Sequence, residues 1–214
     1  QFAHLRDEPN RLYAGMVTEL DRAVGRVLAS LQAHGLEEET LVAFVSDNGP
    51  ANGWGRYIRG WHDDWPERTL LGSAGPLKGH KAQLAEGGIR VPFLLRWPGG
   101  HLPRGTVSNL PVSTLDLYPT FCAAAGTDPP AGTVLDGINL LPCLTGHRST
   151  PPERTLYWKT HNGGAVRRGD WKLVVDRKGR NALYHLGNDV AEQNDLADRN
   201  PDLVRELRSA WEAW

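Results

Sequence analysis

The stretch that decides the fold is "LVAFVSDNGP", residues 41–50. Its apolar residues do not alternate with polar ones, which is typical of a strand buried on both faces of a parallel sheet. The strand ends on Asp47 and Asn48, and Gly49 follows. The carboxyl ends of strands are where α/β sheets usually bind ligands. The stretch therefore predicts an α/β fold with a ligand site at this edge.

The segments around this strand have helix and strand patterns. Residues 10–35 keep helical spacing of apolar residues, with Asn10 as the predicted N-cap. Residues 89–99 predict a second apolar strand, and residues 112–126 predict a helix that stops at a glycine. Residues 136–146 predict a connection with a brief helix. Helices and strands that alternate in this way indicate an α/β domain.

The character of the sequence changes after a proline-rich segment at residues 149–155. Short strand-like runs separated by Gly and Asn turns then predict a small antiparallel sheet. The chain closes on an amphipathic helix with Pro201 in its first turn. We therefore expect two domains: residues 1–150 as an α/β domain, and residues 151–214 as a small α+β subdomain.

Composition excludes several classes of function. The 214 residues carry a net charge of −1, and Lys and Arg are scattered, so we expect no nucleic-acid partner. No apolar run approaches the ~20 residues that a membrane-spanning helix needs. The two cysteines, Cys122 and Cys143, could pair or remain buried thiols, and they do not indicate a compartment.

Asp47 and Asn48 are candidate metal ligands. A carboxylate beside an amide oxygen suits a hard cation such as Ca²⁺ or Mg²⁺, and Gly49 lets the backbone turn sharply after them. The alternative is an ordinary Asx turn after a strand. Two residues cannot complete a shell of about six to eight oxygens, so a metal here needs further ligands from elsewhere.

A cluster of basic residues is the second candidate. Lys78, His80 and Lys81 lie within four residues, shortly before Glu86. A lysine ammonium is a point charge that suits an oxyanion such as sulfate or phosphate. The alternative is an exposed basic loop supported by an ion pair between Glu86 and Arg90.

Several segments occur in a specific order: "FVSDNG", "GHKAQLAEGGIRVPFLLRWPG", "STLDLYPTFCAAAG", "LDGINLLPCLTG", "AVRRGDWKLV" and "LYHLGNDVAEQNDLADRNP". This series resembles the carboxyl-terminal part of type I sulfatases, the arylsulfatase-like branch of the alkaline phosphatase superfamily. The resemblance implies part of an alkaline-phosphatase-like mixed sheet with helices on both faces. A small antiparallel sheet and a C-terminal helix would follow it.

The resemblance also implies roles for residues. Asp47 and Asn48 would be ligands of the active-site Ca²⁺, Lys81 would contact the sulfate, and Glu86 and Arg90 would support the turn. The family hydrolyses sulfate monoesters with a hydrated formylglycine, which is made from Cys or Ser in a C/S-x-P/A-x-R motif. Bound cations stabilise the charge on the sulfate oxygens.

The sequence departs from the family at the nucleophile. No Cys or Ser of these 214 residues fits the C/S-x-P/A-x-R pattern, and the upstream paired aspartates of the calcium shell are also missing. We therefore expect the carboxyl-terminal portion of a sulfatase, without turnover alone. Its partners would be a sulfate ester and either the missing amino-terminal half or an oligomer partner. The family is often secreted, periplasmic or lysosomal, and the sequence does not choose among these.

The loop between the two motifs is expected to border the substrate. Trp54 could stack on a sugar or aryl ring, and His62 could bind a hydroxyl or an anion. His161 of the small subdomain is a further candidate, with a surface histidine as the alternative. A sugar sulfate is one plausible substrate.

Two other functions remain open. A phosphonate or phosphodiester hydrolase of the same superfamily commonly has Asp-His where this chain has Asp47-Asn48, because imidazole suits a transition metal better than calcium. A degenerate, non-catalytic binding protein would explain the missing nucleophile.

Overall fold

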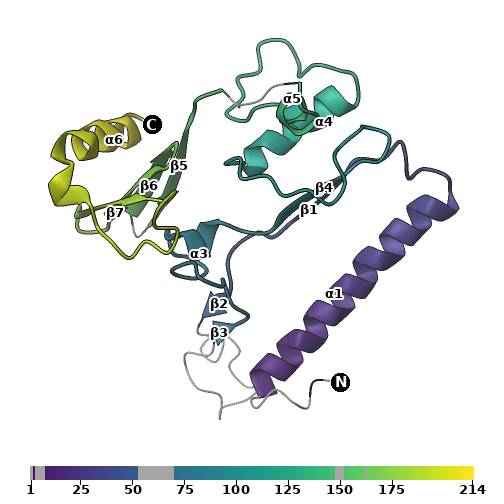
Figure 1. Cartoon of the computed structure of the whole chain (residues 1–214), viewed down its shortest axis with the longest axis horizontal. Coiled ribbons are helices and arrows are strands. Elements are labelled where there is room, and N and C mark those ends of the chain that lie inside the picture. The colour runs from purple at the N-terminus through teal and green to yellow at the C-terminus, as the bar shows by residue number, and fades with distance from the viewer. Residues whose placement is uncertain (1, 3–7, 53–69, 148–151, 162) are drawn as a thin grey trace. The chain divides into compact units, whose positions relative to one another are not determined.

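The computed structural model describes residues 2, 8–52, 70–147, 152–161 and 163–214 (Figure 1). The chain divides into two compact units that are described separately below. The first consists of Gln1–Glu19, Ser46–Val91 and Glu153–Trp214, and the second of Leu20–Val45 and Pro92–Pro152. The predicted domain boundary between residues 150 and 151 stays a prediction.

The first helix begins earlier in the chain than the sequence predicted. Helix α1 spans Glu8–Ala33. The prediction of Asn10 as the N-cap is therefore wrong, because the helix already includes Glu8 and Pro9. An acidic side chain and a proline both suit a first helical turn, where the backbone N–H groups have no acceptor within the helix.

The second unit contains the strand that opened the sequence analysis. Strand β1, Val42–Val45, pairs antiparallel with β4, Phe93–Arg96, with Val42 opposite Arg96. The expectation of a parallel strand buried on both faces is therefore wrong for the described residues: β1 has one partner strand there, and it is antiparallel. The second predicted strand is also shorter than residues 89–99, because a helical turn and Pro92 precede it.

The helical part of the second unit follows the predictions. A 3₁₀ turn, η1 (Thr114–Asp116), leads into α4 (Leu117–Ala124), and α5 spans Leu141–Leu144. The Ser113 hydroxyl accepts a hydrogen bond from the Leu115 N–H at 3.3 Å. The buried Asp116 carboxylate returns the contact by accepting from the Ser113 N–H at 2.8 Å, which is a capping box.

The first unit contains the predicted antiparallel sheet. Its four strands are β5 (Thr155–Thr160), β6 (Gly163–Arg168), β7 (Trp171–Asp176) and β8 (Asn181–His185), in the order β5-β6-β7-β8. A 3₁₀ turn, η2 (Ala197–Arg199), precedes the last helix, α6 (Pro201–Ala213). The predicted sheet, the last helix and the place of Pro201 are confirmed.

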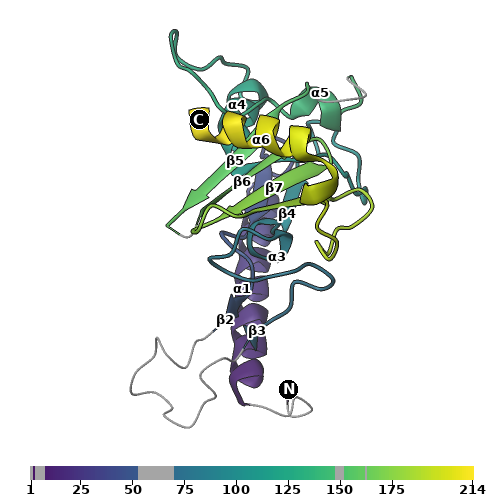
Figure 2. The same ribbon diagram turned by 90° about the vertical axis from the view of Figure 1, so that its left-hand side faces the viewer.

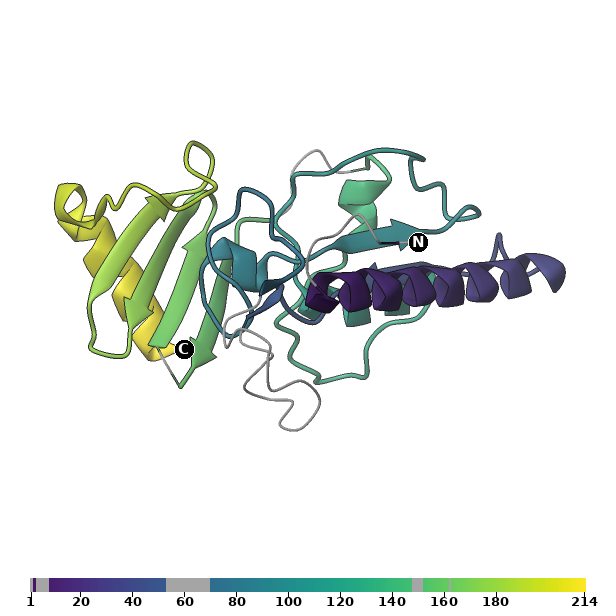
Figure 3. The same ribbon diagram turned by 90° about the horizontal axis from the view of Figure 1, so that it is seen from below.

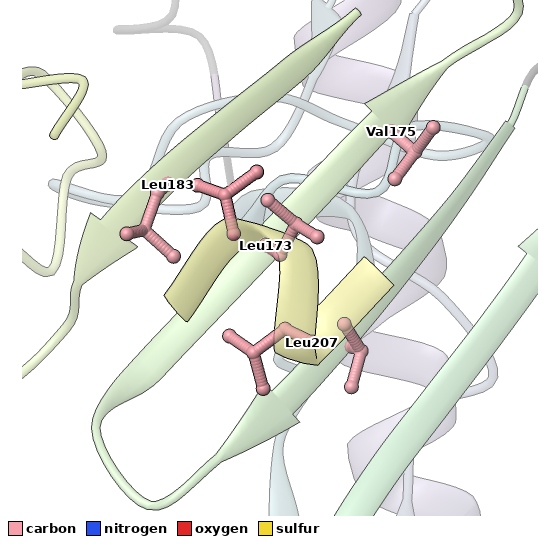
Figure 4. Packing of buried hydrophobic residues seen from close by; sticks show 6 residues of the cluster. Leu173, Val175, Leu183 and Leu207 are labelled. Carbon is pink, nitrogen blue, oxygen red and sulfur yellow. The ribbon is translucent and has the colours of Figure 1, made fainter. Parts of the chain in front are cut away.

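Helix α6 lies across one face of this sheet (Figure 2). The core between them is made of aliphatic side chains, among which Leu173, Leu183 and Leu207 are fully buried (Figure 4). The indole N–H of Trp211 donates to the Trp158 carbonyl at 3.1 Å. Strands and helix therefore share one hydrophobic core.

Helix α3, Glu86–Ile89, faces the other side of the same sheet (Figure 3). The same unit contains a two-stranded ribbon in which β2 (Ala51–Asn52) pairs antiparallel with β3 (Leu70–Leu71).

Cys122 and Cys143 are free thiols. None of the described helices is long and apolar enough to cross a bilayer.

Candidate functional site

Asp47 and Asn48 lie in the bend that follows β1. Asp47 is exposed and Asn48 is half-buried. The Asn48 side-chain nitrogen donates to the Gly49 carbonyl at 2.9 Å, and the Ser46 hydroxyl donates to the Asn48 carbonyl at 3.0 Å. These contacts fix the bend, and neither of them uses the side-chain amide oxygen of Asn48.

Backbone hydrogen bonds join this bend to the basic motif. The Gly49 N–H donates to the Gly88 carbonyl at 3.1 Å, and the Lys81 N–H donates to the Pro50 carbonyl at 2.9 Å. A Cβ atom on Gly49 would lie 1.8 Å from the Gly87 carbonyl oxygen. Only glycine permits so close an approach of two backbones. The two motifs singled out in the sequence are therefore neighbours in one unit.

The basic motif forms a tight loop between these contacts. Lys81 is exposed, and its backbone carbonyl contacts the His80 Nδ1 atom at 3.0 Å. Ala82 has a φ of +69°, a conformation that costs energy for a residue with a Cβ. Within the described ranges, the Lys81 ammonium has neither an ion-pair nor a hydrogen-bond partner. It is therefore available to an anion.

The Asp47 and Asn48 side chains fit a hard cation as partial ligands. Among the residues that the structure describes, the Asp47 carboxylate has no hydrogen-bond or ion-pair partner. The Asn48 amide donates through its nitrogen, so its oxygen is left to accept. Two oxygen donors of this kind match the chemistry that Ca²⁺ prefers. No group of three or more His, Cys, Asp or Glu in the described ranges could hold a metal, so further ligands would have to be supplied from elsewhere.

Glu86, next to these motifs, belongs to a buried ionic cluster. Its Oε1 lies 2.8 Å from Lys172 Nζ, and Lys172 Nζ lies 2.9 Å from Glu192 Oε1. Glu86 Oε2 lies 3.8 Å from Arg167 Nη1. The side chains of Lys172 and Glu192 are fully buried. The "Lys172 cluster", as we call Glu86, Arg167, Lys172 and Glu192, thus balances two carboxylates with two cations.

The register of the sheet explains how the cluster forms. Arg167 in β6 is directly opposite Lys172 in β7, and Lys172 is opposite Tyr184 in β8. Opposite residues share a face, and two like charges in this position repel each other. The carboxylates of Glu86 and Glu192 offset that repulsion. The expected ion pair between Glu86 and Arg90 is therefore wrong in its partner: the structure shows Glu86 paired with Lys172 and Arg167.

The remaining predicted substrate residues are not brought into this arrangement. His161 is exposed in the turn after β5, and none of the contacts described above involves it. Trp54 and His62 lie outside the described residues. Their proposed roles stay predictions.

The Lys172 cluster was missed by sequence reasoning. One signal was available: Lys172 stands in "DWKLVVD", where a charged residue interrupts an apolar strand. A lysine is seldom fully buried without a partner. Glu192 had no comparable signal, because it lies in a polar loop and reaches the cluster only through the fold.

Comparison with known proteins identifies the family of this chain. The Sulfatase family matches residues 5–127, and the chain belongs to it. Rat steryl-sulfatase is 36% identical over 211 residues, which cover 91% of this chain and 34% of that protein. Human arylsulfatase A is 37% identical over 165 residues, which cover 75% of this chain and 29% of that protein.

A solved structure supports the same conclusion for the fold. The structure of Ps i-CgsB in complex with k-i-k-neocarrahexaose has a TM-score of 0.83 and 31% identity, and covers 100% of this chain and 44% of that chain. The chain therefore has the carboxyl-terminal portion of the alkaline-phosphatase-like sulfatase fold, as the resemblance implied. It spans less than half the length of each of these relatives.

Proposed function

We propose that the protein takes part in the hydrolysis of sulfate monoesters, with Asp47 and Asn48 as calcium ligands and Lys81 as a sulfate contact. The observation that carries the proposal is the backbone junction described above. The hydrogen bonds Gly49 to Gly88 and Lys81 to Pro50 hold the two ligand-type motifs side by side in one unit. Membership of the sulfatase family supports the reaction class.

The residues of this chain would bind and orient the ester. The Lys81 ammonium would contact a sulfate oxygen, and its positive charge would offset negative charge on the sulfate as the ester bond breaks. The Asp47 carboxylate and the Asn48 amide oxygen would hold the cation. When bound, Ca²⁺ would supply a fixed positive charge beside the sulfate oxygens.

We further propose that the chain is one portion of a calcium- and formylglycine-dependent sulfatase. Residues 1–214 contain no C/S-x-P/A-x-R sequence, so in this proposal the nucleophile would be supplied from outside them. Apolar exposure supports this proposal: Phe44 in β1 is 38% exposed and Leu94 in β4 is 57% exposed. Apolar strand residues of this kind are normally covered by further structure.

A sulfated sugar is the proposed substrate class. The support is the 31% identity to Ps i-CgsB, whose structure was solved with k-i-k-neocarrahexaose. Relatives named for steryl and aryl substrates share the same portion of the fold.

The test is a turnover assay on the protein at its natural length. An aryl sulfate is compared with a matched aryl phosphodiester and an aryl phosphonate, before and after chelation of calcium. Lys81→Ala is expected to lower kcat for the sulfate by about 10²- to 10³-fold, as for removal of one charge-stabilising donor. Lys178→Ala, which changes an exposed lysine in the turn after β7, is the matched control and is expected to leave turnover unchanged.

The outcomes separate the alternatives. Faster turnover of the phosphodiester or phosphonate would replace the sulfatase proposal by the related hydrolase. Absence of turnover on all three esters, with calcium binding also absent, would favour a non-catalytic protein. Full activity of Lys81→Ala would remove Lys81 from the sulfate site.

A further inference from the structure

The Lys172 cluster connects three segments that are far apart in the chain. Glu86 belongs to α3, Lys172 to β7, and Glu192 to the loop after β8. The Lys172 ammonium lies 2.8 Å from one carboxylate and 2.9 Å from the other. An ammonium that is removed from water needs such partners, and each carboxylate needs the ammonium in return. The small sheet and α3 are therefore tied together by charge.

Glu192 holds the basic loop at both of its ends. Its carboxylate Oε2 accepts the Glu86 N–H at 2.6 Å, and its backbone carbonyl accepts the Lys78 ammonium at 3.1 Å. The Lys78 ammonium also lies 5.3 Å from the centroid of the Tyr184 ring. Glu192 has a φ of +53°, a sparsely populated conformation that persists where the surroundings over-determine it. The loop from Lys78 to Glu86 is thus fixed to the sheet at its start and its finish.

The loop has little room to shift within this frame. The Gly87 N–H donates to the Lys78 carbonyl at 2.7 Å. A Cβ atom would lie 2.5 Å from the Gly79 carbonyl oxygen if added at Gly87, and 2.2 Å from the Gln83 carbonyl oxygen if added at Gly88. Gly88 is also the residue whose carbonyl accepts the Gly49 N–H. A displacement of α3 would therefore also move Gly49, which follows Asn48, and the loop that contains Lys81.

From this geometry we infer that Lys172 is a positioning residue of the ester site, although no ion pair of the described residues joins it to Asp47, Asn48 or Lys81. Its buried ammonium holds Glu86 and Glu192, these hold the loop of residues 78–88, and that loop sets the spacing between Asp47-Asn48 and Lys81. The C-terminal sheet is then part of the machinery that orients the ester, in addition to being a scaffold. The inference rests on the proposed function for its purpose, while the positioning can be tested independently.

The experiment is hydrogen–deuterium exchange on the protein at its natural length, without substrate. Peptides that cover residues 46–50 and 78–90 report the site, and a peptide from β5, which contains no member of the Lys172 cluster, reports the sheet. In Lys172→Met the site amides are expected to exchange about tenfold faster, because loss of the ammonium permits local opening. The amides of β5 should change much less.

A matched control separates positioning from general destabilisation. Leu207→Ala removes a fully buried side chain of the core on the α6 side, away from α3. It should raise exchange in the sheet without a selective increase at the site. Glu192→Gln keeps the shape of the cluster and removes one charge, so it provides a second variant if Lys172→Met does not fold. The double variant Lys172→Met/Glu192→Gln restores the balance of charge and should recover part of the protection.

The result that would overturn the inference is equal acceleration at site and sheet in both cluster variants, or no acceleration at the site. Because no turnover is measured, this failure is distinct from failure of the sulfatase proposal. If exchange rises selectively at the site in a protein that has no sulfatase activity, the inference that Lys172 positions the loop stands. Only the proposed purpose of that positioning is then removed.

Discussion

Two groups of charged residues in the first unit differ in exposure. The Lys172 cluster is buried, with side-chain exposure between 0% and 17%, and its members neutralise one another. Asp47 and Lys81 are exposed, and no described residue pairs with either side chain. Charges that are satisfied inside the protein cannot bind a ligand, whereas exposed unpaired charges can. The comparison favours an architectural role for the first group, and it is consistent with the ligand binding that we propose for the second.

The largest expected effect is the loss of a carboxylate from the buried cluster. Glu86→Ala leaves Lys172 and Arg167 with one carboxylate fewer, and should lower the free energy of unfolding by about 3–5 kcal/mol. The matched control is Glu206→Ala, which breaks the surface ion pair of Arg168 and Glu206. That change should cost about 0–1 kcal/mol. Denaturant unfolding of both variants measures the difference, and equal losses would contradict the contrast between the groups.

An intermediate effect is expected at the junction between the groups. In Gly49→Ala the added Cβ atom would lie 1.8 Å from the Gly87 carbonyl oxygen, so the two backbone segments must move apart. Overpacking of this kind typically costs about 1–3 kcal/mol, and calcium affinity should fall with it. Gly25→Ala in α1 is the control, because an added Cβ would have no neighbour within 4 Å. It should be neutral or stabilising by about 0.5–1 kcal/mol. Thermal unfolding with and without calcium measures both quantities.

The smallest effect is expected in the loop that carries Glu192. The backbone N–H groups of Asn194 and then Gln193 hydrogen-bond the Asp189 carboxylate and lower its pKa. A lowered folded-state pKa gives stability that is present above the unfolded pKa and is lost as the pH falls through the folded value. Asp189→Asn should therefore lower the melting temperature at neutral pH, and the difference from the wild type should shrink in acid. A difference that grows on acidification would contradict this assignment.

The sequence predicted much of the local structure for physical reasons that are local. The brief helix α5, the strands β5–β8 and Pro201 at the start of α6 all rest on short-range patterns. Periodicity, caps and turn residues act over a few positions, so a reader of the sequence can recognise them. The order of the motifs was also sufficient to indicate the family.

Apart from the Asn10 cap, the errors occurred where pairing partners decide the outcome. β1 was expected in a parallel sheet, yet its described partner is the antiparallel β4. An apolar run indicates that a strand is covered by other residues. It does not indicate which strand is its neighbour, or whether that neighbour is parallel or antiparallel. Glu86 was expected to pair with Arg90, four residues away, and instead meets Lys172, 86 residues away.

By itself, the sequence indicated the sulfatase family, the candidate motifs with Asp47, Asn48 and Lys81, and the glycines next to them. The tertiary structure alone decided which backbones approach, and which carboxylates face the buried Lys172. The physical reason is that ligand-type residues and turns are encoded in adjacent positions, whereas the neutralisation of a buried charge depends on strand register and on loops brought together by folding.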